Sequence, residues 1–215
     1  MFVGHYGVSY AFKSIDKSIP LWLLFLAVQF LDVLWSIFVF TGIEKVRIVP
    51  GFTATNPLDL YYMPYTHSLI GALVWSAVGF AGYKIVRKSP VNAAVLIAAA
   101  VFSHWVLDLI VHVHDLAIYD DTMKVGFGLW NYPAVSLGLE IIILFGGIFL
   151  YMRSTAADSS IGKYGMWIYG IVLVLVQAYV FFGSPPSSPS GAAVTALAAY
   201  IVFAGIAYWL ERQRQ

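Results

Sequence analysis

The chain has 215 residues, of which 60% are hydrophobic and 11% are charged, and its formal net charge at pH 7 is +1. A soluble domain carries roughly 25% charged residues, so the composition favours a membrane protein, and the nearly neutral charge gives no basis for a nucleic-acid partner. The chain contains no cysteine, which excludes disulfides, thiolate zinc sites and cysteine nucleophiles.

The apolar segments predict the fold class. A transmembrane helix needs about 20 predominantly apolar residues, and six segments meet this requirement: 20–42, 66–86, 91–113, 133–153, 164–183 and 191–210. We therefore expect an all-α, polytopic membrane helical bundle of about six transmembrane helices, forming a single domain over residues 1–215. Within it, residues 1–155 are expected to hold the functional core, and residues 156–215 to supply two scaffold helices.

The basic residues predict the orientation of these helices. If the N-terminus is cytoplasmic, nine of the twelve Lys and Arg residues lie in cytoplasmic segments. This bias follows the positive-inside rule, so we expect a protein of the inner (cytoplasmic) membrane with both ends in the cytoplasm. The two long loops, 43–65 and 114–132, then face outward.

The segment before the first span contains a histidine, His5, in GHYGVSYAFK. It has no basic region ahead of an apolar run, so we expect it to be retained and not to act as a signal peptide. One interpretation is a re-entrant half-helix, tolerated where protein buries it, which would place His5 about 12 Å inside the membrane. The other is an amphipathic segment at the membrane interface.

Two further ionisable residues fall within or near the first two spans. Asp32 lies near the middle of the first span, in AVQFLDVLWS. If a helix starts at the Asn-Pro of NPLDLYYMPYTHSLIG, His67 is about 15 Å into it and near the depth of Asp32, after a kink at Pro64. The alternatives are a lone buried acid that stays protonated and a histidine at the membrane interface.

The third span ends in the most polar stretch of the chain, SHWVLDLIVHVHDL. His104 and Asp108 are four residues apart, so they lie on one helix face; His112 continues this face, and Asp115 returns close to the same direction. An imidazole and a carboxylate one turn apart can bind one divalent ion, with His112 as a further ligand. The alternative is a set of hydrogen bonds that hold helices together.

Together these residues predict a shared metal site, because ionisable residues inside spans usually face the bundle interior. Glu140, in VSLGLEIIILF of the fourth span, is a candidate general base, a further ligand or a partner for a histidine. Asp115 is the second candidate general base. The expected cofactor is a divalent metal: zinc is favoured, and manganese or iron is also compatible.

The arrangement of these motifs resembles the bacterial inner-membrane proteins known as the LexA-regulated family of metal-dependent hydrolases. The likeness is carried by GHYG, the acid of FLDVLW, YTHSLIG and SHWVLD, and covers roughly residues 1–155. It implies metal-ligand roles for His5, Asp32, His67, His104 and Asp108. This order of ligands is also similar to the start of the ligand series in zinc-dependent phospholipase C, but no later HxxxE motif follows here.

The leading hypothesis is an integral membrane hydrolase that uses a metal ion to act on an amphiphilic or lipid-like substrate, such as a phosphoester. The bilayer and this substrate are its expected partners, and the oligomeric state stays open. One alternative is a transporter or proton-linked permease that uses the same Asp and His groups as a relay. The other is a non-catalytic membrane subunit.

Overall fold

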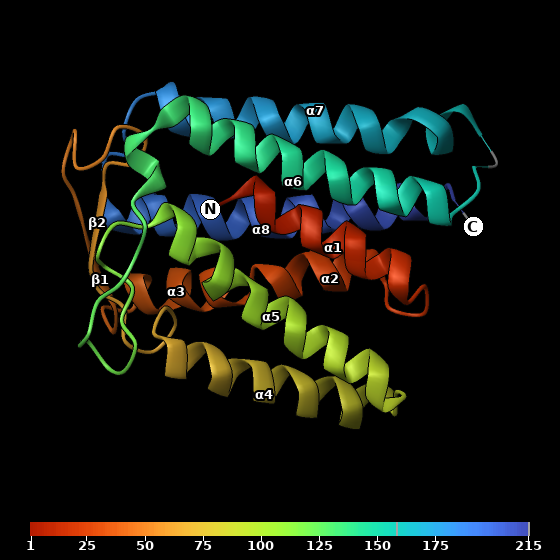
Figure 1. Cartoon of the computed structure of the whole chain (residues 1–215), viewed down its shortest axis with the longest axis horizontal. Helices are drawn as coiled ribbons and strands as arrows, with labels where there is room; N and C mark the ends of the chain where they lie inside the picture. The colour runs from red at the N-terminus through yellow and green to blue at the C-terminus, as the bar shows by residue number, and fades with distance from the viewer. Residues whose placement is uncertain (158, 215) are drawn as a thin grey trace.

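The computed structural model describes residues 1–157 and 159–214, and these are mostly helical (Figure 1). The eight α-helices found in these residues are α1 (Val3–Ile15), α2 (Leu21–Val28), α3 (Phe30–Phe40), α4 (Leu69–Arg87), α5 (Val91–Val111), α6 (Pro133–Ser154), α7 (Ser160–Phe182) and α8 (Pro189–Glu211). A hairpin of β1 (Lys45–Ile48) and β2 (Leu58–Tyr62) and a short 3₁₀ helix, η1 (Leu129–Asn131), lie at one end of the bundle (Figure 1).

Five of these helices, α4 to α8, are long and apolar enough to cross a membrane, and a sixth span results if α2 and α3 are counted together. Large apolar side chains cover their outer faces: Ile142 is 70% exposed and Leu175 is 64% exposed. Such a surface suits hydrocarbon and not water. The structure therefore confirms the predicted helical bundle with five to six candidate spans.

The first span, expected to be continuous over residues 20–42, is broken. Helices α2 and α3 meet at Gln29 with a bend of 55°. In a continuous helix the carbonyl of Val28 would accept a hydrogen bond from the N–H of Asp32. Here it accepts from Nδ1 of His104 at 2.7 Å, and such an insertion of a side chain into the helix ladder is a known cause of kinks.

The N-terminal segment forms a buried helix, as the re-entrant interpretation predicted. Helix α1 starts inside the bundle, near the label N in Figure 1, and packs along α6. The two backbones touch at a pair of glycines: a Cβ atom on Gly7 would lie 2.2 Å from the carbonyl oxygen of Ile143, and one on Gly147 would lie 2.0 Å from that of Gly7. Glycine at both positions thus allows α1 to lie in the core.

The prediction of a helix starting at Asn56 was wrong, and with it the kink at Pro64. Residues 58–62 form β2, which pairs antiparallel with β1, and Arg47 donates a 3.0 Å hydrogen bond to Asp59 across the hairpin. Helix α4 begins only at Leu69, where the Ser68 hydroxyl accepts from an N–H of the first turn. His67 therefore lies in the loop that leads into α4.

Candidate metal centre

Six side chains from four parts of the chain converge on one another. Their sources are α1, α3, the loop before α4 and the C-terminal end of α5, and they are the predicted ligands His5, Asp32, His67, His104, Asp108 and His112. Five are at most 3% exposed, whereas the side chain of Asp32 is 17% exposed. The centre is therefore buried and opens beside Asp32.

Asp32, His67 and His104 form a first group with the spacing of metal ligands. Nε2 of His67 lies 3.3 Å from Oδ1 of Asp32, and Nε2 of His104 lies 3.6 Å from the same oxygen. The two imidazole rings are inclined by 72°. This angle allows the lone pairs of the two nitrogens to point towards one position.

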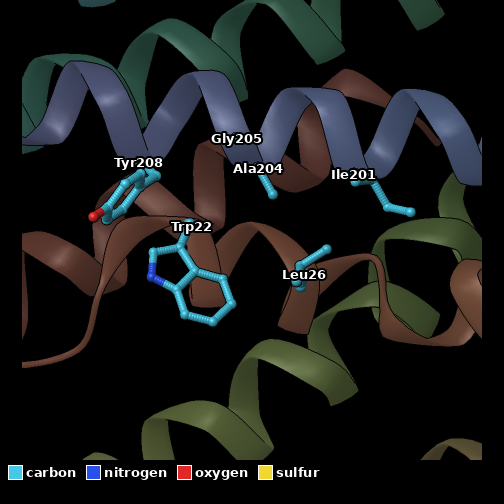
Figure 2. Close-up of a pocket in the computed structure, with 6 residues that line it drawn as sticks. All are labelled: Trp22, Leu26, Ile201, Ala204, Gly205 and Tyr208. Carbon is cyan, nitrogen blue, oxygen red and sulfur yellow. The ribbon is translucent and has the colours of Figure 1, made fainter.

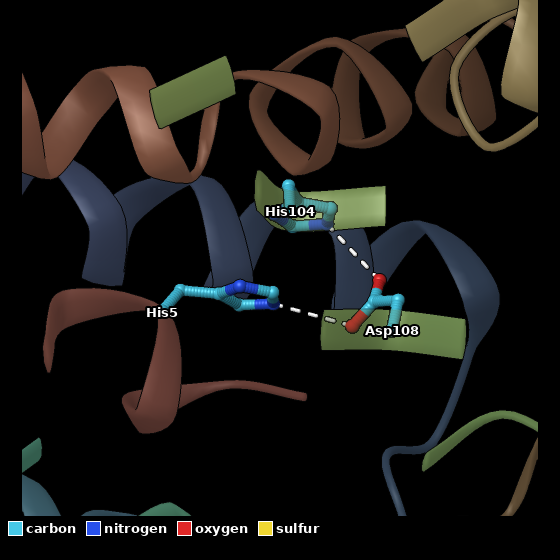
Figure 3. A group of neighbouring side chains, drawn as sticks. All are labelled: His5, His104 and Asp108. Carbon is cyan, nitrogen blue, oxygen red and sulfur yellow. Dashed lines mark hydrogen bonds and ion pairs between the residues drawn. The ribbon is translucent and has the colours of Figure 1, made fainter. Parts of the chain in front are cut away.

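A second group, His5, His104 and Asp108, shares His104 with the first (Figure 3). Nε2 of His5 lies 3.2 Å from Oδ1 of Asp108, and Nε2 of His104 lies 3.1 Å from Oδ2. The rings of His5 and His104 are stacked, with centroids 4.0 Å apart and planes inclined by 8°.

Ring orientation favours the first group as the site for one ion. An ion binds imidazole along the nitrogen lone pair, in the plane of the ring, at about 2.0–2.1 Å for zinc. The stacked His5 and His104 rings lie in nearly parallel planes with centroids 4.0 Å apart, so one ion cannot lie in the plane of both at that distance. The ring planes of His67 and His104 cross at 72°, so this geometric obstacle does not apply to them.

Hydrogen bonds at Nδ1 fix how three of the histidines face the centre. Nδ1 of His104 donates to the carbonyl of Val28, and Nδ1 of His112 donates to Oδ1 of Asp115 at 2.9 Å. Nδ1 of His67 is 2.7 Å from the hydroxyl oxygen Oγ1 of Thr66. Each ring therefore turns Nε2 inward, which is the arrangement of metal-binding histidines that are oriented by an outer partner.

Asp108 connects the two groups through its two oxygens. Oδ1 faces His5 and the amino group of Met1, whereas Oδ2 faces His104 and, at 3.5 Å, Nε2 of His112. His104 and His112 are one turn before and one turn after Asp108. This is the stripe that the four-residue spacing predicts, although α5 ends at Val111 and His112 has an extended backbone.

The two predicted general bases have different surroundings. Oε2 of Glu140 accepts from the N–H groups of Phe2 and Gly4, at 3.0 and 3.1 Å, and Oε1 accepts from Nε2 of Gln177 at 3.0 Å. Glu140 therefore holds the N-terminus of α1 in place. Asp115 holds His112 through Oδ1, and its Oδ2 is buried with no hydrogen-bond partner among the described residues.

The last two helices contribute contacts that the sequence did not indicate. The Tyr200 hydroxyl of α8 donates to Oδ2 of Asp32 at 2.8 Å, and Gln177 belongs to α7. In the sequence, Tyr200 ends GAAVTALAAY, a stretch typical of close helix packing, so no local signal marks it. His114, by contrast, is exposed and lies outside the centre.

An apolar groove of about 470 Å³ runs between α2 and α8 (Figure 2). Its lining residues are Trp22, Leu26, Ile201, Ala204, Gly205 and Tyr208. Ala204 is one helical turn from Tyr200, which binds Asp32. The groove therefore neighbours the turn of α8 that carries Tyr200, although neither Tyr200 nor Asp32 is among its lining residues.

Comparison with models of protein families, with curated proteins and with solved structures gives no match for this chain. No family is identified, so the resemblance to the LexA-regulated hydrolases depends on the sequence motifs alone. The findings describe a helical chain with five to six candidate spans and buried His/Asp groups that could hold a metal ion.

Proposed function

We propose that the chain is an integral membrane hydrolase that depends on a divalent metal and acts on an amphiphilic or lipid-like substrate, such as a phosphoester. The supporting observation is the convergence of His67 and His104 on Asp32, with Nδ1 of each ring held by an outer partner. Following the distribution of Lys and Arg, we place the protein in the inner membrane with both ends in the cytoplasm.

The chemistry of the ligand set fits a divalent ion. Imidazole and carboxylate ligands without thiolate suit zinc, manganese or iron. Two carboxylates, Asp32 and Asp108, would offset much of the positive charge of the ion, as burial in a low-dielectric interior requires. A bound ion would supply Lewis acidity that polarises the scissile bond and activates water.

The His112–Asp115 pair is our candidate for proton transfer. His112 belongs to neither of the two ligand groups, yet its Nε2 faces Asp108 at the edge of the centre. Asp115 would hold the ring and stabilise the imidazolium that forms when His112 accepts a proton. Glu140 is engaged in three hydrogen bonds, so we assign it the task of placing α1.

The groove between α2 and α8 supports a lipid-like substrate. It is apolar, lies on helices with the composition of membrane spans and neighbours the turn of α8 that carries Tyr200, the partner of Asp32. A hydrocarbon chain in this groove would lie within the bilayer, next to the turn of α8 that carries Tyr200. A polar, water-soluble substrate would not bind in an apolar groove of this kind.

Elemental analysis of the purified protein tests the metal centre, with His104→Ala as the test variant and His114→Ala as the matched control. We expect bound metal in the wild type and in His114→Ala, because His114 is exposed, and none in His104→Ala. Bound metal should also be released below about pH 6, where imidazole ligands become protonated. A wild type without metal overturns the proposal.

A panel of phospholipid, lipid-phosphate and ester substrates in detergent then tests hydrolysis with the metal-loaded protein. We expect turnover of at least one amphiphilic substrate by the wild type and none by His104→Ala. If the protein binds metal but turns over no substrate of the panel, the proposed hydrolase activity is excluded and the proposed metal centre is retained.

A transporter is the second candidate, because one helix is broken next to an ionisable residue. Discontinuous helices form the substrate and ion sites of many transporters, and the break between α2 and α3 lies close to Asp32. Uptake of a substrate or of protons into proteoliposomes, abolished by Asp32→Asn, would favour this candidate over hydrolysis.

A further inference from the structure

A buried carboxylate outside the six candidate ligands is connected to the centre through one hydroxyl group. Glu44, which is 1% exposed, lies between α3 and β1, and its N–H donates to the carbonyl of Phe38 at 3.1 Å. Its Oε1 accepts from the backbone N–H groups of Tyr65 and Thr66, both at 2.9 Å. Its Oε2 accepts from the Thr66 hydroxyl at 2.7 Å.

These bonds determine which group donates and which accepts along the series Glu44, Thr66 and His67. An ionised carboxylate only accepts hydrogen bonds, so the Thr66 hydroxyl must give its proton to Glu44. The hydroxyl oxygen can then only accept from His67, whose Nδ1 is 2.7 Å away. Nδ1 must therefore carry a proton, and in the neutral ring the lone pair is on Nε2, which faces Asp32 and Asp108 at 3.3 and 3.8 Å.

We propose that Glu44, acting through Thr66, is a positioning residue that sets the tautomer of His67 and so prepares Nε2 to bind a cation. The inference deepens the proposed metal centre and rests on it for its function, but the tautomer itself is a property of the metal-free protein. Outer partners of this kind typically change metal affinity 10–100-fold.

Glu44→Gln tests this inference because it keeps the shape of the side chain but reverses the direction of the hydrogen bonds that connect position 44, Thr66 and His67. The two backbone N–H groups require an acceptor at the position of Oε1, so the amide oxygen of glutamine must lie there. The amide NH₂ then faces the Thr66 hydroxyl and donates to it. The hydroxyl would donate to Nδ1 of His67, and the proton of the ring would move to Nε2.

The tautomer is measured by ¹⁵N NMR of metal-free protein labelled at histidine, with the His67 signal assigned from its loss in His67→Ala. Burial raises the pKa of the Glu44 carboxyl, whereas the hydrogen bonds from Thr66 and Tyr65 oppose this shift. Spectra are therefore recorded near pH 8, roughly four units above the ordinary carboxylate range. We expect Nδ1–H in the wild type and Nε2–H in Glu44→Gln.

Two substitutions at Thr66 complete the test. Thr66→Val keeps the shape but removes the hydroxyl, and it should weaken zinc affinity about 10–100-fold. Thr66→Ser keeps the hydroxyl and should restore wild-type affinity and tautomer. In every variant, unchanged signals from the other histidines show that the fold is intact.

The outcomes separate this inference from the metal proposal. An Nδ1–H tautomer in both wild type and Glu44→Gln, with the fold intact, overturns the inference, because a purely structural Glu44 would leave the tautomer unchanged. A tautomer switch in a protein that binds no zinc supports the hydrogen-bond chain and overturns only the metal centre.

Discussion

The contact between α1 and α6 gives a prediction whose size follows from the structure. In Gly147→Ala the new Cβ would lie 2.0 Å from the carbonyl oxygen of Gly7, and its nearest neighbours are all backbone atoms. The helices must separate by about 1.4 Å to reach the 3.4 Å of ordinary van der Waals contact. A shift of this size would lengthen the 3.0 and 3.1 Å bonds from Phe2 and Gly4 to Glu140 beyond hydrogen-bond range.

Overpacking alone typically costs about 1–3 kcal/mol, and each lost bond to a charged group adds about 1.5–3 kcal/mol. With both bonds lost, we expect a decrease of at least about 4 kcal/mol in the free energy of unfolding, which corresponds to a fall of at least about 8 °C in Tm for a chain of this size. Thermal unfolding in detergent measures it.

Gly146→Ala is the matched control, because a Cβ there meets no atom within 4 Å. Alanine is the better helix former, so this control should be neutral or slightly stabilising. Equal Tm values for the two variants would refute the close packing of α1 on α6, and with it the reason for glycine at position 7.

Three further predictions concern proton transfer, topology and substrate access. His112→Gln should keep its bound metal but lose turnover by about 10²–10⁴-fold, and a loss of metal instead would make His112 a ligand. In whole cells, a cysteine at Ser187→Cys should react with an impermeant thiol reagent and one at Ala156→Cys should not; the reverse pattern overturns the orientation. Gly205→Leu adds a side chain into open space in the groove, so it should slow turnover of long-chain substrates more than short-chain ones. Gly138→Leu, also in open space but on α6, should affect neither, and equal effects of the two variants would exclude the groove as the route.

The sequence predicted what depends on local periodicity. The apolar segments indicated the spans, and the four-residue spacing of His104 and Asp108 placed both on one face of α5. Asp32 and His67 were expected to join them, but the depth assigned to His67 assumed a helix from Asn56, whereas the structure brings His67 in from a loop.

The remaining contacts depend on pairings between distant segments, which a single sequence does not reveal. Glu44 and Thr66 are 22 residues apart, and Tyr200 and Asp32 are 168 apart. From the sequence, Glu140 was a candidate general base, because a buried acid in a membrane span indicates function. Its three hydrogen bonds to α1 and α7 became visible only when those helices were placed beside it.

The bend between α2 and α3 has a consequence for how the protein is made. The imidazole that occupies the Val28 carbonyl belongs to residue 104, which the ribosome adds 76 residues later. Until then nothing competes with the Asp32 N–H for that carbonyl, so residues 21–40 can enter the bilayer as one straight helix. The bend, and with it the final position of Asp32, forms only when α5 docks. The docking of α5 and the bending of the segment formed by α2 and α3 are therefore the same event.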